Sequence, residues 1–470
     1  MPPKVALLAF FLFTYLLFRI ERKLNPWASI ALWIPTIWLL IMGSRPVGAW
    51  LNPAAEGGSD LEGSAADRLV LNILIFLGIW VLSRRKVDWN HLIKQNGCLI
   101  LLYLYLFASI FWSEFFFSSF KRWFKISGTI VMALIIYSEK KPFQALESIL
   151  RRAAYILIPL SLVLIKYFPV YGIRYTPWEG TRMGTGVTTH KNSLGILCML
   201  LAFTIFWSIL QRWHSKKLFK NKQALIADSF VLCIAIYLLT GGGGGYSATS
   251  LLIFSLSVVT LLILPLLRKL HTFIATHFEF SLLLLILLVM FFYTTLLPII
   301  TSALGRNETL TGRSDIWTTV IEVADRNPIL GTGYGGYWGL VANAYSYHHG
   351  VKQSHNGYLD VYLQVGWLGI FMLLAFLKEF FKKVQKTLKF SRKIGIFGTC
   401  FVLQLLIYNY SEAAFIQASL MWTVTIFIAI ILSNADNYLY VRKYCNQMNL
   451  MRNQTYKKYE KLKEVYYQPK

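Results

Sequence analysis

The sequence has few charged residues and very few cysteines, and each shortage excludes familiar classes of protein. Only 15% of its 470 residues are charged, against roughly a quarter in soluble domains, whereas 56% are apolar. The five cysteines form no CxxC pair and none lies in a long polar loop, so neither a disulfide framework nor a thiolate metal site is indicated. The composition therefore predicts an all-α integral membrane protein, in which repeated apolar runs replace a single buried core.

Acidic residues are scarce as well, since 22 Asp and Glu stand against 47 Lys and Arg. A formal net charge of +25 would suit a nucleic-acid partner, but the basic residues lie in short clusters between apolar runs. Membrane topology accounts for them better, because positive charge gathers in cytoplasmic connections and contacts anionic lipid headgroups. We therefore expect contacts with membrane lipids and no nucleic-acid partner.

Thirteen apolar runs predict a polytopic bundle of 12–13 transmembrane helices over residues 1–433, followed by a basic cytoplasmic tail at 434–470. Several runs are shorter than the ~20 residues that cross a bilayer, and 126–138 is the weakest. The first run precedes Arg19, Arg22 and Lys23 and has no small-residue cleavage site, so it is interpreted as a retained helix; without it, twelve spans remain. The runs lie at 4–20, 27–43, 69–83, 98–112, 126–138, 153–168, 193–210, 225–240, 247–267, 280–300, 356–377, 395–410 and 412–433.

Alternating the connections across the membrane places most basic clusters on one side, which we expect to be cytoplasmic. The long polar segment 301–355 then becomes a periplasmic loop. Because the runs themselves contain little charge, we also expect the charged groups to be concentrated outside the membrane.

A glycine-rich stretch at 240–250, TGGGGGYSATS, has the composition of a phosphate-binding loop. It lacks the Gly-Lys-Ser/Thr ending and lies between two spans on the outer side, where no nucleotide pool exists. A tight turn between helices is the better prediction.

The segment 301–355 holds the residues best suited to a phosphorylated ligand. Arginine is the preferred bidentate partner of phosphate, and fixed cations would stabilise a leaving pyrophosphate. Arg313 is therefore assigned to the ligand, with Arg306 as a further candidate, while neighbouring acids offer ordinary ion pairs to both. Apolar spacing predicts an amphipathic helix over 315–326 at the membrane–water boundary. The expected apolar face comprises Ile316, Trp317, Val320, Ile321 and Ala324.

A glycine- and aromatic-rich tract, ILGTGYGGYWG at 329–339, follows this helix. Its glycines permit positive φ and close approach of the backbone, and exposed rings of Tyr334, Tyr337 and Trp338 would stack on sugar faces. A flexible loop with an aromatic belt explains the same composition equally well.

Two histidines are expected at the starts of outward-facing spans. His355 follows Ser354, the expected N-cap, and the positive end of the helix dipole disfavours imidazolium there. His355 is therefore a candidate base, with a simple polar anchor as the alternative. His190 repeats this placement beside Lys191, which offers another phosphate contact, in the glycine-rich segment 169–192 that also contains Arg182. Glu412 lies between the last two runs, where we expect it to end a helix or pair with an arginine.

The order of motifs GRSDIW, NPILGTGYG and SHNGYLDVYLQVGWLG resembles the O-antigen ligase and O-antigen polymerase family of bacterial envelope proteins. His355-Asn356, nine residues, Gly366, two residues and Gly369 is similar to the ligase signature. Arg306 with Leu310 fits the family's pattern of Arg, three residues and Leu, and Arg313 competes for the same role. A weaker likeness covers 182–195, and the earlier runs match only in hydropathy.

The resemblance implies a GT-C-like multi-spanning glycosyltransferase in the bacterial inner membrane, with its active site facing the periplasm. Such an enzyme is inverting and metal-independent, uses no cofactor, and moves a glycan from undecaprenyl pyrophosphate to an acceptor hydroxyl. The acceptor is lipid A–core in ligases and another lipid-linked glycan in polymerases. Together with this resemblance, the residues lead to the hypothesis that His355 and Arg313 are catalytic and that the pyrophosphate is bound by Arg306, Arg182, Lys191 and His190.

Two alternatives from other classes stay open. A transporter or flippase for a lipid-linked glycan would also need many helices and a polyprenyl phosphate site, but would place ionisable groups near the bilayer midplane. A structural scaffold for envelope assembly would tolerate substitution of all these site residues.

Overall fold

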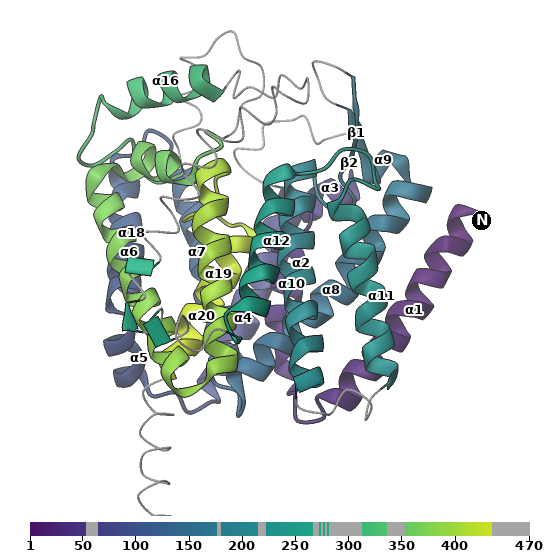
Figure 1. The fold of residues 1–470 in the computed structure, drawn as a ribbon. Helices are drawn as coiled ribbons and strands as arrows, with labels where there is room; N and C mark the ends of the chain where they lie inside the picture. The colour runs from purple at the N-terminus through teal and green to yellow at the C-terminus, as the bar shows by residue number, and fades with distance from the viewer. Residues whose placement is uncertain are drawn as a thin grey trace, which may run out of the picture.

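Long helices run side by side through the molecule, as Figure 1 shows. The computed structural model describes residues 1–52, 64–175, 180–214, 222–266, 313–335 and 353–434, with a few positions between 272 and 281. The helices are α1 (Pro3–Leu24), α2 (Trp33–Met42), α3 (Val47–Leu51), α4 (Ala65–Ser83), α5 (Trp89–Gln95), α6 (Gly97–Ala108), α7 (Phe116–Tyr137), α8 (Pro142–Tyr167), α9 (Pro169–Gly172), α10 (Lys191–His214), α11 (Lys222–Leu239), α12 (Ala248–Ile263), α16 (Arg313–Ala324), α18 (Gly357–Phe390), α19 (Arg392–Ser411) and α20 (Leu420–Ile431). Short 3₁₀ turns lie at Ile30–Leu32, Ser109–Trp112 and Leu432–Asn434, and β1 (Ile173–Tyr175) pairs antiparallel with β2 (Arg182–Gly184).

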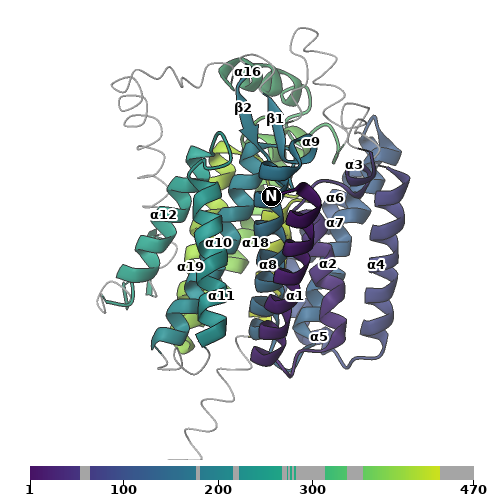
Figure 2. The same ribbon diagram turned by 90° about the vertical axis from the view of Figure 1, so that its right-hand side faces the viewer.

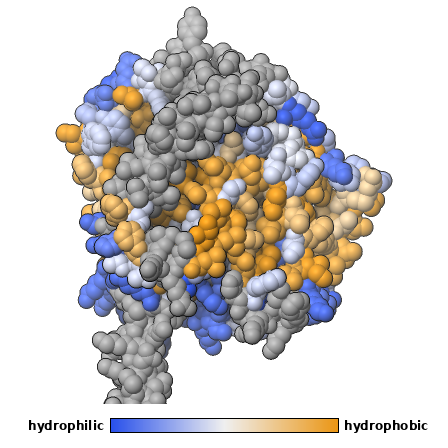
Figure 3. Space-filling model, viewed as in Figure 1, coloured by the Kyte–Doolittle hydropathy of each residue, from blue (hydrophilic) through white to orange (hydrophobic). Residues whose placement is uncertain are grey.

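The predicted fold class, a polytopic helical membrane protein, is confirmed. Within the described ranges, seven helices are long and apolar enough to cross a membrane, and an eighth results if the bent pair Trp89–Gln95 and Gly97–Trp112 is one span. Three shorter apolar helices lie at Ile30–Met42, Ala248–Ile263 and Leu420–Asn434. On the face seen in Figure 3, apolar side chains cover the middle of the bundle and hydrophilic ones gather toward its ends.

Several predicted runs differ in extent from the helices that form, and two of them bear on the argument. The weak run 126–138 is the second half of α7, which has 22 residues. The last run, 412–433, was predicted too long, because residues 412–419 leave the helix and α20 begins only at Leu420. Apart from its first two residues, the run 280–300 lies outside the described residues, as does the tail 435–470.

The connections that alternation assigned to one side lie at one end of the bundle. In Figures 1 and 2, α3, the β1–β2 hairpin and α16 are at this end, which we call the site end, whereas α5 lies at the opposite end. The predicted alternation of these connections is therefore confirmed.

Buried ion pairs join α1, α8, α10 and α11, and of their six members only Asp228 lies inside a predicted apolar run. Three arginines and three acids take part, and their charges balance. In an apolar environment such groups are retained only when they pair, which explains why the network links four helices. The pairs are Glu21–Arg152 at 3.1 Å, Glu147–Arg151 at 2.7 Å, Arg151–Asp228 at 3.6 Å and Arg212–Asp228.

The amphipathic helix predicted in the long loop is α16, and it packs on the start of α18. Val320, Val323 and Ala324 of α16 form a small buried cluster with Leu363 of α18. Ile321, which we expected on the apolar face, is instead 43% exposed. Hydrophobic burial therefore fixes α16 above the first turns of α18.

Helix α18 is broken at Gly366, where the backbone has φ 60° and ψ −165°. The segment after α16 fills the break: the N–H groups of Trp367 and Leu368 donate to the carbonyls of Pro328 and Ile329, at 2.8 and 3.2 Å. A side chain at Gly366 would meet the Ile329 carbonyl oxygen at 2.3 Å. The glycine thus allows the close approach that supplies partners to the freed backbone groups.

The glycine-rich tract supplies hydrogen bonds to the residues of α18 that precede the break. The N–H groups of Thr332 and Gly333 donate to the carbonyls of Leu363 and Gln364, at 3.0 and 2.9 Å. Tyr334 is buried and its hydroxyl donates to the Ile416 carbonyl at 2.8 Å, so the expectation of an exposed, sugar-stacking ring is wrong for this residue. Positions 336–339, including Tyr337 and Trp338, lie outside the described residues.

Candidate functional site

His355 occupies a strained turn at the start of α18. Its φ is 54°, a left-handed value that is uncommon for residues other than glycine. The N-cap is Asn356, whose Oδ1 accepts from the N–H groups of Tyr358 and Leu359 at 3.0 and 3.2 Å; the expectation that Ser354 caps the helix is wrong. The capped helix therefore holds its N-terminus in place while His355 stands just before it.

Glu412 is the principal partner of His355. The imidazole Nδ1 lies 3.0 Å from Glu412 Oε2, to which Gln353 Nε2 also donates at 3.2 Å. Asn192 Nδ2 donates to the second oxygen, Oε1, at 2.6 Å. The Glu412 side chain is 5% exposed and that of His355 26%. The carboxylate is thus fixed by amides from two other segments, and the histidine is the exposed member of the pair.

Further contacts dock the His355 turn onto the turn between α19 and α20. Asp360 accepts from the Ser354 N–H at 3.1 Å and from Gln417 Nε2 at 3.1 Å. Asn409 Oδ1 accepts from two backbone N–H groups of the second turn, and an added Cβ at Gly357 would lie 2.2 Å from this oxygen. The spacing between His355 and Glu412 is therefore set by two rigid turns.

The second predicted segment brings Arg182, His190 and Lys191 to the same end. Gly184 of β2 donates from its N–H to the Gly244 carbonyl at 2.5 Å. A Cβ added at Gly245 would lie 3.6 Å from the Arg182 carbonyl oxygen and 3.8 Å from Lys191 Cδ. The glycine run at 241–245 is thus a tight turn between α11 and α12, as predicted, and it packs against both cations.

His190 connects this segment to the His355–Glu412 pair. Its Nδ1 accepts from the Asn192 N–H at 3.2 Å, and Asn192 in turn contacts Glu412. Burial lowers the pKa of His190 below its ordinary value, with the Glu412 charge opposing this shift and the charges of Lys191 and His355 adding to it. Burial is the largest effect, so His190 is favoured in its neutral form.

Arg45, which the sequence analysis passed over, holds the backbone that leads to His190. Its guanidinium donates to the carbonyls of Gly186 and Thr188 at 2.8 and 3.0 Å, and the side chain is buried. Burial and the charge of Arg174 lower the pKa of Arg45 to about 10, which leaves it cationic at neutral pH. A lone arginine in a Ser-Arg-Pro turn gives no sequence signal for this role.

The arginines of the long loop are described only in part. Arg306 lies outside the described residues, and Arg313 is placed as the first residue of α16 by its backbone alone. Trp317, one helical turn after Arg313, donates from Nε1 to the Ser354 carbonyl at 2.8 Å. Trp317 therefore ties α16 to the His355 turn.

No group of three or more metal-ligating side chains occurs in the described ranges. Around the Glu412 carboxylate the described polar groups are the imidazoles of His355 and His190 and the amides of Asn192 and Gln353, and the adjoining segment carries Arg182 and Lys191. This set suits the binding of an anion and the transfer of a proton.

Comparison with known proteins agrees with these motifs. A model of the family described as O-antigen ligase matches residues 229–374, a range that contains Arg306, Arg313, His355 and Gly366. The chain is also similar to the exopolysaccharide production protein ExoQ of Rhizobium meliloti (strain 1021), with 26% identity over 344 residues, covering 68% of this chain and 73% of the relative. The family implies a glycan-transferring enzyme that uses lipid-linked glycans. The predicted resemblance is thus confirmed: residues 229–374 of this multi-pass membrane protein match the O-antigen ligase family.

Proposed function

We propose that the protein transfers a glycan from undecaprenyl pyrophosphate to an acceptor hydroxyl at the site end of the bundle, on the periplasmic side of the bacterial inner membrane. The observation that carries this proposal is the pair formed by His355 and the buried carboxylate of Glu412, at 3.0 Å, beside a segment that carries Arg182 and Lys191. A base and a set of cations are the two things that displacement of a pyrophosphate requires.

The geometry supports a base role for His355. A carboxylate at Nδ1 favours the tautomer that is protonated there, which leaves the lone pair of Nε2 for an acceptor hydroxyl. Within the described residues, Nε2 makes no hydrogen bond. Glu412 would also stabilise the imidazolium that forms when the acceptor proton is taken up, and its own burial keeps it in place.

The reaction balances as a single displacement. The acceptor oxygen forms a bond to the anomeric carbon as its proton moves to His355 Nε2, and the bond from that carbon to the pyrophosphate oxygen breaks. The leaving undecaprenyl pyrophosphate keeps the electron pair. Arg182 and Lys191, with Arg306 and Arg313 from the long loop, would bind this anion, and His190 would line the site in neutral form. Attack opposite to the leaving group inverts the anomeric carbon, and no metal is needed for these steps.

The identity of the acceptor is inferred from the named relative and not from the geometry of the site. A relative named for exopolysaccharide production favours a second lipid-linked glycan over lipid A–core. Purified protein incubated with a defined undecaprenyl-pyrophosphate oligosaccharide and either acceptor, followed by mass spectrometry of the products, tests both. We expect His355→Ala to reduce transfer by about 10²–10⁴-fold. His277→Ala is the matched control, because this exposed histidine lies outside the site.

Transport of a lipid-linked glycan is the second candidate, because the buried ion pairs and the broken helix α18 are features that transporters use. The ion pairs, however, neutralise one another and join helices. The same preparation in sealed vesicles separates the two functions: a transporter would move the donor across the membrane with no new glycosidic bond. Full transfer activity in His355→Ala would refute the proposed base.

A further inference from the structure

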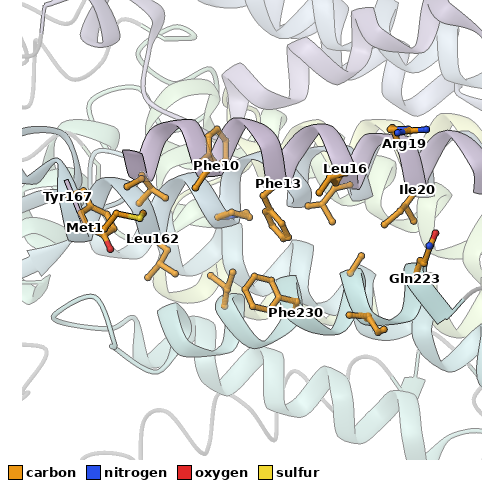
Figure 4. Close-up of a pocket in the computed structure, with 18 of the residues that line it drawn as sticks. Met1, Phe10, Phe13, Leu16, Arg19, Ile20, Leu162, Tyr167, Gln223 and Phe230 are labelled. Atoms are coloured by element: carbon orange, nitrogen blue, oxygen red, sulfur yellow. The ribbon is translucent and has the colours of Figure 1, made fainter. Parts of the chain in front are cut away.

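Helix α1 leaves an apolar groove along the side of the bundle, at a distance from the residues of the candidate site. The groove has a volume of about 790 Å³ and is lined by α1, α8 and α11. This volume lies within the ~300–1,000 Å³ typical of small-molecule sites. Figure 4 shows Met1 and Tyr167 at one end of this α1 groove and Arg19, Ile20 and Gln223 at the other.

The walls of the groove are almost wholly apolar and lie within the membrane. Phe13 of α1 and Phe230 of α11 face each other across it, with ring centroids 5.3 Å apart. Only 22% of the spanning part of α1 is buried in the protein, the smallest share among the spans in the described ranges. The groove is therefore a lateral seam that hydrocarbon must fill, and its occupant would complete the packing of α1.

The charge at one end of the groove indicates which lipid fits. Arg19 and Lys23 line this end, and neither has an ion-pair partner among the residues that the structure describes. Glu21 is the only acid of α1, but its carboxylate is buried and bonds to Arg152 and Asn25, at 3.1 Å each. Two exposed cations thus stand unneutralised at the mouth of an apolar groove.

We propose that the α1 groove binds one anionic phospholipid from the leaflet opposite the site end. The phosphate lies at Arg19 and Lys23, where α1 leaves the membrane, and the acyl chains run along the apolar walls toward Phe13 and Phe230. The lipid joins α1 to α11, a contact that the protein makes only loosely by itself. This inference concerns neither the glycan nor the transfer reaction, and it stands whether or not the proposed function is correct.

The test is a lipid titration of the purified full-length protein in detergent. Phosphatidylglycerol is expected to raise the midpoint of thermal unfolding with saturation, and phosphatidylcholine with the same acyl chains is not. The double variant Arg19→Gln/Lys23→Gln should lower the apparent affinity for phosphatidylglycerol about thirty-fold, because each basic residue near an anionic lipid contributes roughly a factor of five. The basic side chains near the end of α1, those of Arg19, Arg22 and Lys23, are all exposed, so substituting them is compatible with folding.

The matched control is Arg22→Gln, which removes one positive charge from the same turn of α1 but from a residue that does not line the groove. It should keep the affinity within about twofold. A second pair tests the apolar part: Ala9→Trp, inside the groove, should abolish the effect of the lipid, whereas Leu8→Trp, 69% exposed outside it, should not. Equal stabilisation by phosphatidylcholine, or an equal loss in Arg22→Gln, would overturn the proposal.

Discussion

The substitution Glu412→Gln tests whether the partner of His355 acts in the reaction. Glutamine keeps the size and the amide-binding geometry of the side chain but removes its charge. Glu412 Oε2 lies 3.0 Å from His355 Nδ1, and the carboxylate is 5% exposed, so the interaction is shielded from solvent. A hydrogen bond to a charged group contributes about 1.5–3 kcal/mol, which corresponds to roughly 10- to 150-fold in rate if the imidazolium forms in the transition state.

The assay is the initial rate of glycan transfer, measured together with the midpoint of thermal unfolding. We expect Glu412→Gln to lose roughly 10- to 150-fold in kcat with little change in KM for the donor, because the carboxylate acts on the histidine and does not contact the pyrophosphate. Asn192 and Gln353 bond to the carboxylate oxygens, so a fall in thermal stability would reveal a structural component. Glu412→Asp keeps the charge on a shorter side chain, so its kcat should lie between those of the wild type and Glu412→Gln.

The matched control is Glu322→Gln, an identical change at an acid of α16 at the site end whose side chain is 73% exposed. Its only described ion pair is with Arg326 at 4.0 Å, an interaction of little energy at an exposed position. This variant should keep full activity. Full activity in folded Glu412→Gln as well would refute the reasoning, since the neutral side chain would then serve His355 equally well.

Three further predictions concern the structure that supports the site. Gly366→Ala should lower the free energy of unfolding by roughly 2–6 kcal/mol, because an added Cβ meets the Ile329 carbonyl oxygen at 2.3 Å and φ is 60°; Gly97→Ala, with no atom within 4 Å, is the control in a thermal melt. Arg45→Gln should lower the free energy of unfolding by roughly 2–4 kcal/mol, because the buried carbonyls of Gly186 and Thr188 lose their donor. Limited proteolysis should detect opening of the loop that contains these two residues. His190 is buried in neutral form, so the unfolded state takes up a proton first as pH falls through ~6.5, and acid should destabilise the wild type more than His190→Gln in melts between pH 8 and 5.

Hydropathy was sufficient for the helices because each span must satisfy its own backbone hydrogen bonds and present apolar side chains to lipid. Both conditions are local, so the run at 69–83 predicts where α4 ends, although the helix begins earlier, at Ala65. Hydropathy failed for the run 412–433, because residues 412–419 are apolar enough to be included in a span although they form the turn that carries Glu412. Hydropathy shows which residues can lie in an apolar environment. It does not show where a helix ends when that end is buried in the protein.

The glycine-rich tract shows why a motif and its role are separate questions. Its glycines were correctly expected to permit close backbone approach, but the backbone that they approach is α18, 30 or so residues further along the chain. The partner of a freed N–H group is fixed by tertiary packing, which no spacing rule within the tract reveals. At Gly366, the glycine of the family signature therefore marks a break in α18, and neighbouring backbone groups supply the hydrogen bonds that the broken helix lacks.

Glu412 ends α19, as expected, but its contact with His355 could not be predicted from the sequence, and the reason is physical. An acid at a helix end has an ordinary local explanation, and its distinction arises from contacts with His355, 57 positions earlier, and Asn192, 220 positions earlier. Desolvation makes such a carboxylate costly unless several donors bind it, and here His355, Gln353 and Asn192 supply three. The neutral His190 nearby and the exposed face of His355 leave that charge directed at one imidazole, which is the arrangement a proton acceptor requires.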